Sequence, residues 1–167
     1  MAIVYSGRVF SVDVETIYSP DGRAHVVETV RHRPSVVLVP MPDDHHVVLV
    51  RQYRHSVTRE LWELPAGGVN TGESPEAAAA RECEEETALA PGRVDRLREL
   101  FPAPGFCDEV LVFFRCSDLR TPPPDSPHKP DDDEYIETKV VTVAEAKAMV
   151  ERGEIRDLKT AYGLTLI

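Results

Sequence analysis

Apolar and polar side chains alternate along the N-terminal part of the chain, and this period of two predicts β-strands. Residues 2–18 alternate over a length that suits one or two strands. Residues 25–32 form the return strand after the hairpin turn signal Asp21-Gly22. Two β-branched runs follow at residues 35–40 and 47–54, separated by a turn that begins with proline, so we expect a second hairpin there.

The rest of the chain mixes helical and strand periods. Helical spacing and capping residues predict helices at residues 74–88, 144–152 and 157–166. Further strands are predicted at residues 94–100, 110–115 and 138–142. Residues 121–133 are rich in proline and aspartate and should form an exposed loop. Strands and helices in this order predict an α/β or α+β domain with a mixed sheet.

Composition narrows the class of protein. The 167 residues suffice for one hydrophobic core and are too few for two ordinary domains. The formal net charge of −10 should repel nucleic acid and anionic membranes, so we expect neither as a partner. We find no apolar run of membrane-spanning length and no signal peptide. The three cysteines fit neither a zinc motif nor a disulfide framework, and a cytoplasmic protein is the expectation.

The predicted helix at 74–88 carries an unusual number of acids. Ser74 is a good N-cap and suits the start of this helix. Glu82, Glu85 and Glu86 stand at i, i+3 and i+4, so they share one face. Two such charges about 6 Å apart repel by roughly 2–3 kcal/mol at an effective dielectric constant near 20.

A divalent cation would remove this repulsion. Hard cations such as Mg²⁺ prefer carboxylate oxygens and often bridge to substrate phosphates. We therefore place Glu82, Glu85 and Glu86 as metal ligands, with Arg81 pairing with Glu85 to hold that carboxylate in place. The alternative for an acidic helix is an ordinary solvated face.

The full pattern around this helix reads G-x5-E-x7-R-E-C-x-E-E-x-A-L, from Gly67 to Leu89. It resembles the Nudix box, G-x5-E-x7-R-E-U-x-E-E-x-G-U, in which U is a large apolar residue. Every charged position matches. Cys83 fills an apolar position, which is a mild departure because cysteine behaves as a small hydrophobe. Ala88 replaces a glycine suited to a left-handed helix end, so we expect the helix to end differently, near Pro91.

Segments outside the box resemble the ADP-ribose pyrophosphatase branch of the Nudix superfamily. These segments are residues 50–54, 62–67, 102–109, 131–137 and 149–157. The resemblance implies a Nudix-type α/β/α sandwich with a central mixed sheet over residues 33–167. It also implies that residues 1–32 build a small antiparallel sheet that helps to form a homodimer.

The resemblance adds site residues to the three glutamates. It implies that the backbone carbonyl of Ala66 is a further metal ligand. It also implies that a glutamate on the loop after residue 130 closes over the substrate as general base or extra ligand. Glu134 is the first choice and Glu137 the second, against the alternative of a solvated acidic loop.

Four residues are candidates for binding the substrate. Arg54 is the best candidate to bind the diphosphate because a guanidinium matches phosphate oxygens in pairs, and Arg51 is a weaker one. Glu109 resembles a family position near the terminal ribose, and Gly67 lies in the glycine loop. The alternatives are a surface ion pair for Arg54 and a loop-end salt bridge for Glu109.

The sequence thus predicts an enzyme that uses Mg²⁺ or Mn²⁺ to hydrolyse the diphosphate bond of a nucleoside-diphosphate sugar. By resemblance, the leading substrate is ADP-ribose, with AMP and ribose 5-phosphate as products. One alternative is an enzyme of the same fold for GDP-mannose or a dinucleoside polyphosphate. Another is a non-catalytic nucleotide-sugar sensor, although such modules typically lack one or more of the acids present here.

Overall fold

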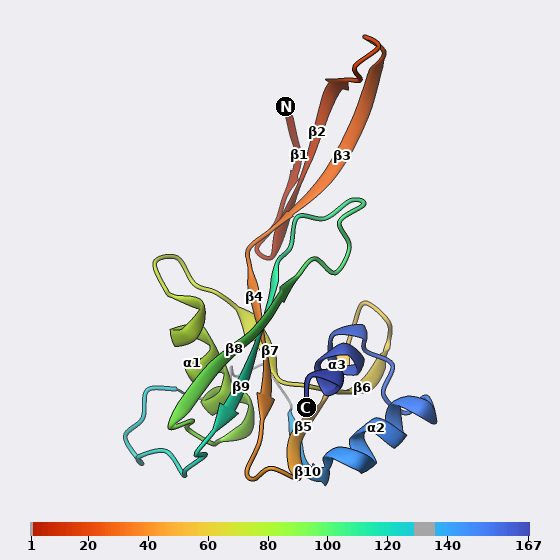
Figure 1. Cartoon of the computed structure of the whole chain (residues 1–167). Helices are drawn as coiled ribbons and strands as arrows, with labels where there is room; N and C mark the ends of the chain where they lie inside the picture. Colours follow the sequence, from red (N-terminus) through yellow and green to blue (C-terminus); the bar gives the residue numbers. More distant parts are fainter. Residues whose placement is uncertain (1, 129–135) are drawn as a thin grey trace.

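The computed structural model describes residues 2–128 and 136–167. In these ranges the strands form three sheets, and helices pack beside them (Figure 1). The strands are β1 (Ala2–Ser6), β2 (Phe10–Tyr18), β3 (Ala24–His32), β4 (Ser35–Pro40), β5 (His46–Arg54), β6 (Arg59–Glu63), β7 (Ala66–Gly68), β8 (Arg93–Leu100), β9 (Leu111–Ser117) and β10 (Glu137–Thr142). The helices are α1 (Pro75–Thr87), α2 (Val143–Glu151) and α3 (Leu158–Gly163), followed by the 3₁₀ turn η1 (Leu164–Leu166). No helix in these ranges is long and apolar enough to cross a membrane.

The N-terminal strands form an antiparallel sheet of their own, in the order β1-β2-β3. This sheet projects from the rest of the molecule in Figure 1, where it is drawn in red and orange. The alternation in residues 2–18 therefore encodes two strands, and the predicted turn at Asp21-Gly22 is confirmed, with Gly22 at a φ of 83°.

The prediction of a hairpin from residues 35–40 and 47–54 is wrong. Strand β4 pairs with β7 and, in parallel, with β9, whereas β5 pairs with β6 and β10 in a different sheet. All six residues of β4 are buried, as expected for a strand covered on both faces and both edges. Short loop length favoured the hairpin, but burial of β4 between two partners decided the pairing.

Strands β6 and β7 did not appear in the sequence pattern. They have five and three residues, and β7 is the sequence Ala-Gly-Gly, which has no alternation to detect. Strand β6 pairs with β5 and strand β7 pairs with β4, so the segment from Trp62 to Gly68 connects the three-stranded sheet that contains β5 to the four-stranded sheet that contains β4.

The core lies on both faces of the four-stranded sheet β7-β4-β9-β8. One buried cluster, which includes Val37 and Phe113, packs toward α2 and the C-terminal turn. Its counterpart, which includes Val36 and Phe114, packs under α1. Successive residues of β4 and β9 thus serve opposite faces, and Figure 1 shows α1 on one side with α2 and α3 on the other. The predicted α/β fold with a mixed central sheet between helices is confirmed.

Helix α1 starts as predicted and ends as the box pattern does, despite the substitution at its end. The Ser74 side chain accepts a hydrogen bond from the Ala77 amide at 3.1 Å, and Pro75 occupies the first turn. Ala88 adopts the left-handed conformation, with φ 55° and ψ 29°, and its amide donates to the Glu84 carbonyl. The expected end near Pro91 is therefore wrong, because this cap hydrogen bond outweighs the strain of a left-handed alanine.

Candidate active site

Strand β7 lies directly beneath the acidic face of α1. A Cβ atom added to Gly67 would overlap the Glu82 carboxylate, so glycine is the residue that allows this close approach. The neighbouring Gly68 gives its carbonyl oxygen to the Arg81 guanidinium, at 3.0 Å. The glycine loop and the helix are thus fitted to each other at the carboxylates.

Arg81 gathers three carboxylates around one guanidinium. Its Nε and Nη2 donate to the two oxygens of Glu73, both at 2.9 Å, and its Nη1 donates to Glu82 and Glu85, both at 2.7 Å. The hydrogen bonds to Glu73, followed by those to Glu82 and Glu85, raise the pKa of Arg81, and the Arg81 bond in turn lowers the pKa of Glu73. The predicted pairing of Arg81 with Glu85 is confirmed, and Arg81 orients the other two acids as well.

The donor set at this helix fits a hard divalent cation. Its side-chain donors are carboxylates, Glu86 is only 8% exposed, and the backbone of β7 at Gly67 lies against the Glu82 carboxylate. In the described ranges, no three histidine, cysteine or acidic side chains are already arranged as a ligand cluster. The guanidinium of Arg81 instead neutralises Glu82 and Glu85, so a cation would have to share these carboxylates with it.

Glu84, on the same helix, contacts a different segment from Glu82 and Glu85. It is 8% exposed, and its carboxylate accepts a hydrogen bond from the Ser126 hydroxyl. This bond holds the predicted loop against α1. It brings His128 Nδ1 to 4.0 Å from a Glu85 oxygen, so the loop approaches the acidic face just before the residues that the structure does not describe.

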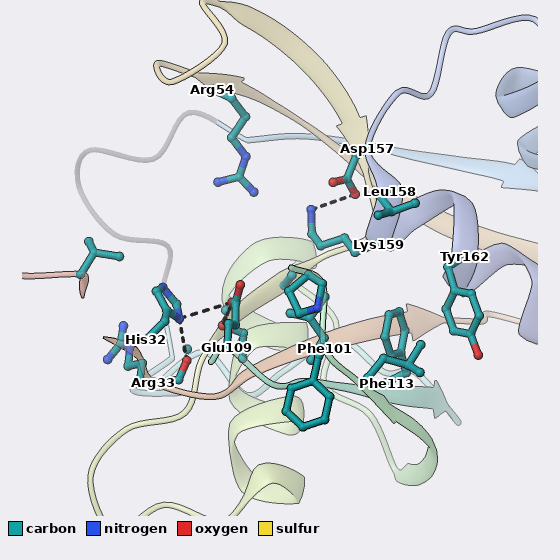
Figure 2. Close-up of a pocket in the computed structure, with 18 of the residues that line it drawn as sticks. His32, Arg33, Arg54, Phe101, Glu109, Phe113, Asp157, Leu158, Lys159 and Tyr162 are labelled. Atoms are coloured by element: carbon teal, nitrogen blue, oxygen red, sulfur yellow. Dashed lines mark hydrogen bonds and ion pairs between the residues drawn. The ribbon is translucent and has the colours of Figure 1, made fainter. Parts of the chain in front are cut away.

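A cavity of about 720 Å³ opens beside β7 (Figure 2). Its lining includes three positions of β7. Further lining residues come from the N-terminal sheet and its turns, from the loop after β8 and from helix α3. The lining residues are Arg8, Val9, His32, Arg33, Ser35, Arg54, Ala66, Gly67, Gly68, Leu100, Phe101, Pro102, Glu109, Leu111, Phe113, Asp157, Leu158, Lys159 and Tyr162.

Two of the predicted substrate-binding side chains line this cavity on different walls. Arg54 comes from the end of β5, and Glu109 comes from the loop before β9 (Figure 2). Glu109 accepts a hydrogen bond from the Ser35 hydroxyl at 2.8 Å and lies 3.4 Å from His32 Nδ1. Arg54 pairs with the buried Glu63 through both carboxylate oxygens.

The remaining predicted residues lie partly at the cavity and partly away from it. Arg51 forms an ion pair with Glu137 at 2.7 Å, packs over the ring of Trp62, and is not a lining residue of the cavity. Ala66 and Gly67 line the cavity. Glu134, the first choice for general base, lies outside the described residues.

Sequence reasoning missed Lys159, His32 and Arg33 in this cavity. One signal could have pointed to Lys159. It stands in the first turn of α3, two residues after the capping Asp157, where the helix dipole disfavours a positive charge. A lysine at such a position needs a local carboxylate partner or a function.

The fold thus places a cavity with basic side chains on one side of β7 and the carboxylate-rich helix α1 against the same strand. The family model for the NUDIX domain matches residues 31–161, and the chain belongs to the Nudix family, as a pyrophosphohydrolase. The box resemblance and the predicted class of enzyme are thereby confirmed.

Curated relatives cover nearly the whole chain. An ADP-ribose pyrophosphatase of Bacillus subtilis (strain 168) is 34% identical over 96% of this chain and 86% of its own length. An ADP-ribose pyrophosphatase of Mycobacterium tuberculosis (strain ATCC 25618 / H37Rv) is 36% identical over 91% of this chain and 73% of its own. The crystal structure of an ADP compounds hydrolase has the same fold, with a TM-score of 0.86 at 24% identity, covering 99% of this chain and 88% of that one.

Proposed function

We propose that this enzyme hydrolyses the diphosphate bond of ADP-ribose to give AMP and ribose 5-phosphate. The observation that carries the proposal is the position of β7, which is shared by two parts of the site. Its residues Ala66 to Gly68 line the 720 Å³ cavity and also lie beneath Glu82 and Arg81. A diphosphate bound against β7 in the cavity would therefore lie on the strand that also contacts Glu82. The names of the two curated relatives support ADP-ribose as the substrate.

We assign Glu82, Glu85, Glu86 and the Ala66 carbonyl to hold Mg²⁺ or Mn²⁺. When bound, such an ion neutralises phosphate charge and activates a water molecule. Arg81 keeps Glu82 and Glu85 oriented through its two Nη1 hydrogen bonds. Glu134 remains our candidate for the general base, because the loop that leads to it is held against α1 by Ser126.

The cavity walls supply substrate contacts. Arg54 donates its remaining N–H groups to the diphosphate, since Glu63 engages only Nε and Nη2. Glu109 accepts hydrogen bonds from hydroxyl groups of the terminal ribose, and its Ser35 contact fixes its direction. Gly67 lines the cavity with its backbone, and its missing side chain leaves the space that the Glu82 carboxylate fills.

We also propose that residues 1–32 are a dimerisation sheet attached to a hydrolase domain at 33–167. The register of β2 and β3 places Phe10, Val12, Val14 and Tyr18 on the same face as Val26 and Val30. Tyr18 is 72% exposed and Val26 is 68% exposed, so apolar side chains are left uncovered near the β2–β3 turn on this face, which also carries Glu28. A second copy of the chain would cover it.

A substrate panel tests the proposed reaction. The protein is incubated with ADP-ribose, GDP-mannose or a diadenosine polyphosphate in the presence of Mg²⁺ or Mn²⁺, and phosphorus NMR identifies the products. We expect AMP and ribose 5-phosphate, with ADP-ribose cleaved at the highest kcat/KM. Faster cleavage of GDP-mannose or of the dinucleotide would overturn the substrate assignment. Binding of ADP-ribose without any product would show a sensor instead of an enzyme.

A further inference from the structure

Glu63 is a buried carboxylate that lies between two cations at the wall of the cavity. It is 1% exposed and ends strand β6. Arg54 Nε and Nη2 donate to its two oxygens at 2.8 and 2.7 Å, which is a side-on, bidentate pair. Lys159 Nζ donates to one of the same oxygens. One buried acid thus holds two basic side chains from β5 and α3.

A closed ring of hydrogen bonds fixes this arrangement. Lys159 Nζ also donates to Asp157 at 2.9 Å, and Asp157 caps α3 by accepting from the Thr160 amide at 2.9 Å. The Thr160 hydroxyl accepts from the Leu64 amide at 2.7 Å. Because Leu64 follows Glu63 in the chain, the ring returns to its start. The end of β6 and the first turn of α3 cannot move apart without breaking it.

The charges explain why Glu63 is needed. Burial alone would raise the pKa of Glu63, but the hydrogen bond from Arg54 and the charge and hydrogen bond of Lys159 outweigh burial and lower this pKa. Glu63 therefore stays ionised near neutral pH. Without its negative charge, the neighbouring cations Arg54 and Lys159 would repel each other.

Both cations keep donors for a ligand. Glu63 occupies two of the five N–H groups of Arg54, and the two carboxylates occupy two of the three N–H groups of Lys159. Both side chains line the same cavity, and Figure 2 shows their head groups on the same wall, across from Glu109 and His32. Phosphate oxygens are the acceptors that such paired donors match.

We infer that Lys159 is a second phosphate-binding residue, paired with Arg54, and that Glu63 is the positioning residue that holds the two together. The inference deepens the proposed function and rests on it for the identity of the substrate. The chemistry it requires is narrower, since the pair needs only a diphosphate group.

The test compares Lys159→Met with Lys147→Met, which makes the same change on α2 away from the cavity. For Lys159→Met we expect the KM for ADP-ribose to rise about tenfold or more, with kcat changed much less, because a charge-assisted hydrogen bond to the bound substrate is lost. Lys159→Arg should keep most of the affinity. Lys147→Met should match the wild type. A Lys159→Met enzyme with unchanged KM and a lower melting temperature would overturn the inference and reduce Lys159 to a structural tie.

A binding experiment separates this inference from the proposed function. Calorimetry measures the affinity of each variant for inorganic pyrophosphate, which needs no turnover. We expect about tenfold weaker binding by Lys159→Met and by Glu63→Gln than by the wild type, and no change in Lys147→Met. Equal pyrophosphate affinity in Lys159→Met and wild type overturns the cation pair. Normal pyrophosphate binding by a wild type that does not cleave ADP-ribose overturns only the proposed substrate.

Discussion

Gly67 occupies the point where the carboxylate of Glu82 meets strand β7. Any Cβ at this position overlaps the carboxyl group of Glu82, whose chain neighbour Arg81 contacts the same carboxylate. The requirement is one of space, since the backbone of Gly67 is in an ordinary strand. The residue therefore links the glycine loop to the proposed ligand geometry.

Replacing Gly67 by alanine should displace Glu82 and lower kcat/KM for ADP-ribose by about tenfold or more while the fold persists, because the clash acts on a proposed metal ligand. Gly105→Ala is the matched control, because a Cβ at Gly105 meets nothing within 4 Å. Steady-state kinetics and circular dichroism of both variants check the prediction. Equal activity of the two variants would show that Glu82 is free to shift without cost.

Single residues were predictable from sequence when their partners were local. The Arg81–Glu85 pair follows from i, i+4 spacing, and the Ser74 cap follows from its position before a proline. The Lys159–Glu63 contact joins residues 96 positions apart, and the ring through Thr160 depends on how α3 lies against Leu64, which follows β6. No local pattern encodes such a contact, so Lys159 was missed while Arg54 was found by its chemistry.

The end of helix α1 shows what an element can tolerate. Ala88 takes a left-handed conformation, with a φ of 55°, at the position where the box pattern has glycine. A left-handed alanine costs roughly 1–2 kcal/mol, yet the helix keeps its boundary because the Ala88 amide caps the Glu84 carbonyl.

Ala88→Gly should therefore raise the free energy of unfolding by about 1 kcal/mol and the melting temperature by about 2–4 °C. Ala80→Gly, within the same helix, should lower the free energy of unfolding by about 0.5–1 kcal/mol. Thermal and urea unfolding of the two variants measures both values. Destabilisation by both glycines would mean that the left-handed residue carries no strain in this chain.

Elements were predicted better than their pairing. The β-branched runs at residues 35–40 and 47–54 are both strands, but the inferred hairpin was wrong, because β4 is the fully buried centre of one sheet and β5 belongs to another. The observed partners of β4 are β7 and β9, and β9 lies about 80 residues away in the chain. Turn signals between neighbouring segments cannot predict such a distant pairing. Very short strands such as β7 cannot be predicted in this way, because three residues are too few to show an alternating pattern.

At the scale of the whole molecule, the N-terminal sheet is the proposed dimerisation surface. The sheet projects from the rest of the molecule (Figure 1). Tyr18 and Val26 are exposed on one of its faces, and His32, at the end of β3, lines the cavity. If a second copy covers this face, the N-terminal sheets of the two chains are in contact. Each sheet also contributes to one wall of its own chain's cavity.

Val26→Glu should convert a dimer into a monomer, because it places a charge in the apolar face of the proposed contact. His25→Glu adds the same charge to the opposite face and should leave the dimer intact. Sedimentation equilibrium of both variants and the wild type gives the mass of the species in solution. A monomeric wild type, or a dimeric Val26→Glu variant, would rule out this face as the interface.

The proposed reaction requires that the carboxylates of α1 hold a divalent cation, which makes the diphosphate bond of ADP-ribose cleavable. The most direct measurement is the initial rate of AMP release as Mg²⁺ is titrated, for the wild type, for Glu86→Gln and for Glu76→Gln on the exposed first turn of the helix. We expect Mg²⁺ to activate the wild type and Glu76→Gln in a saturable manner. The rate of AMP release by Glu86→Gln should be lower than that of the wild type by about a hundredfold or more. Release of AMP that persists under a chelator, or an unchanged rate in Glu86→Gln, would contradict the claim.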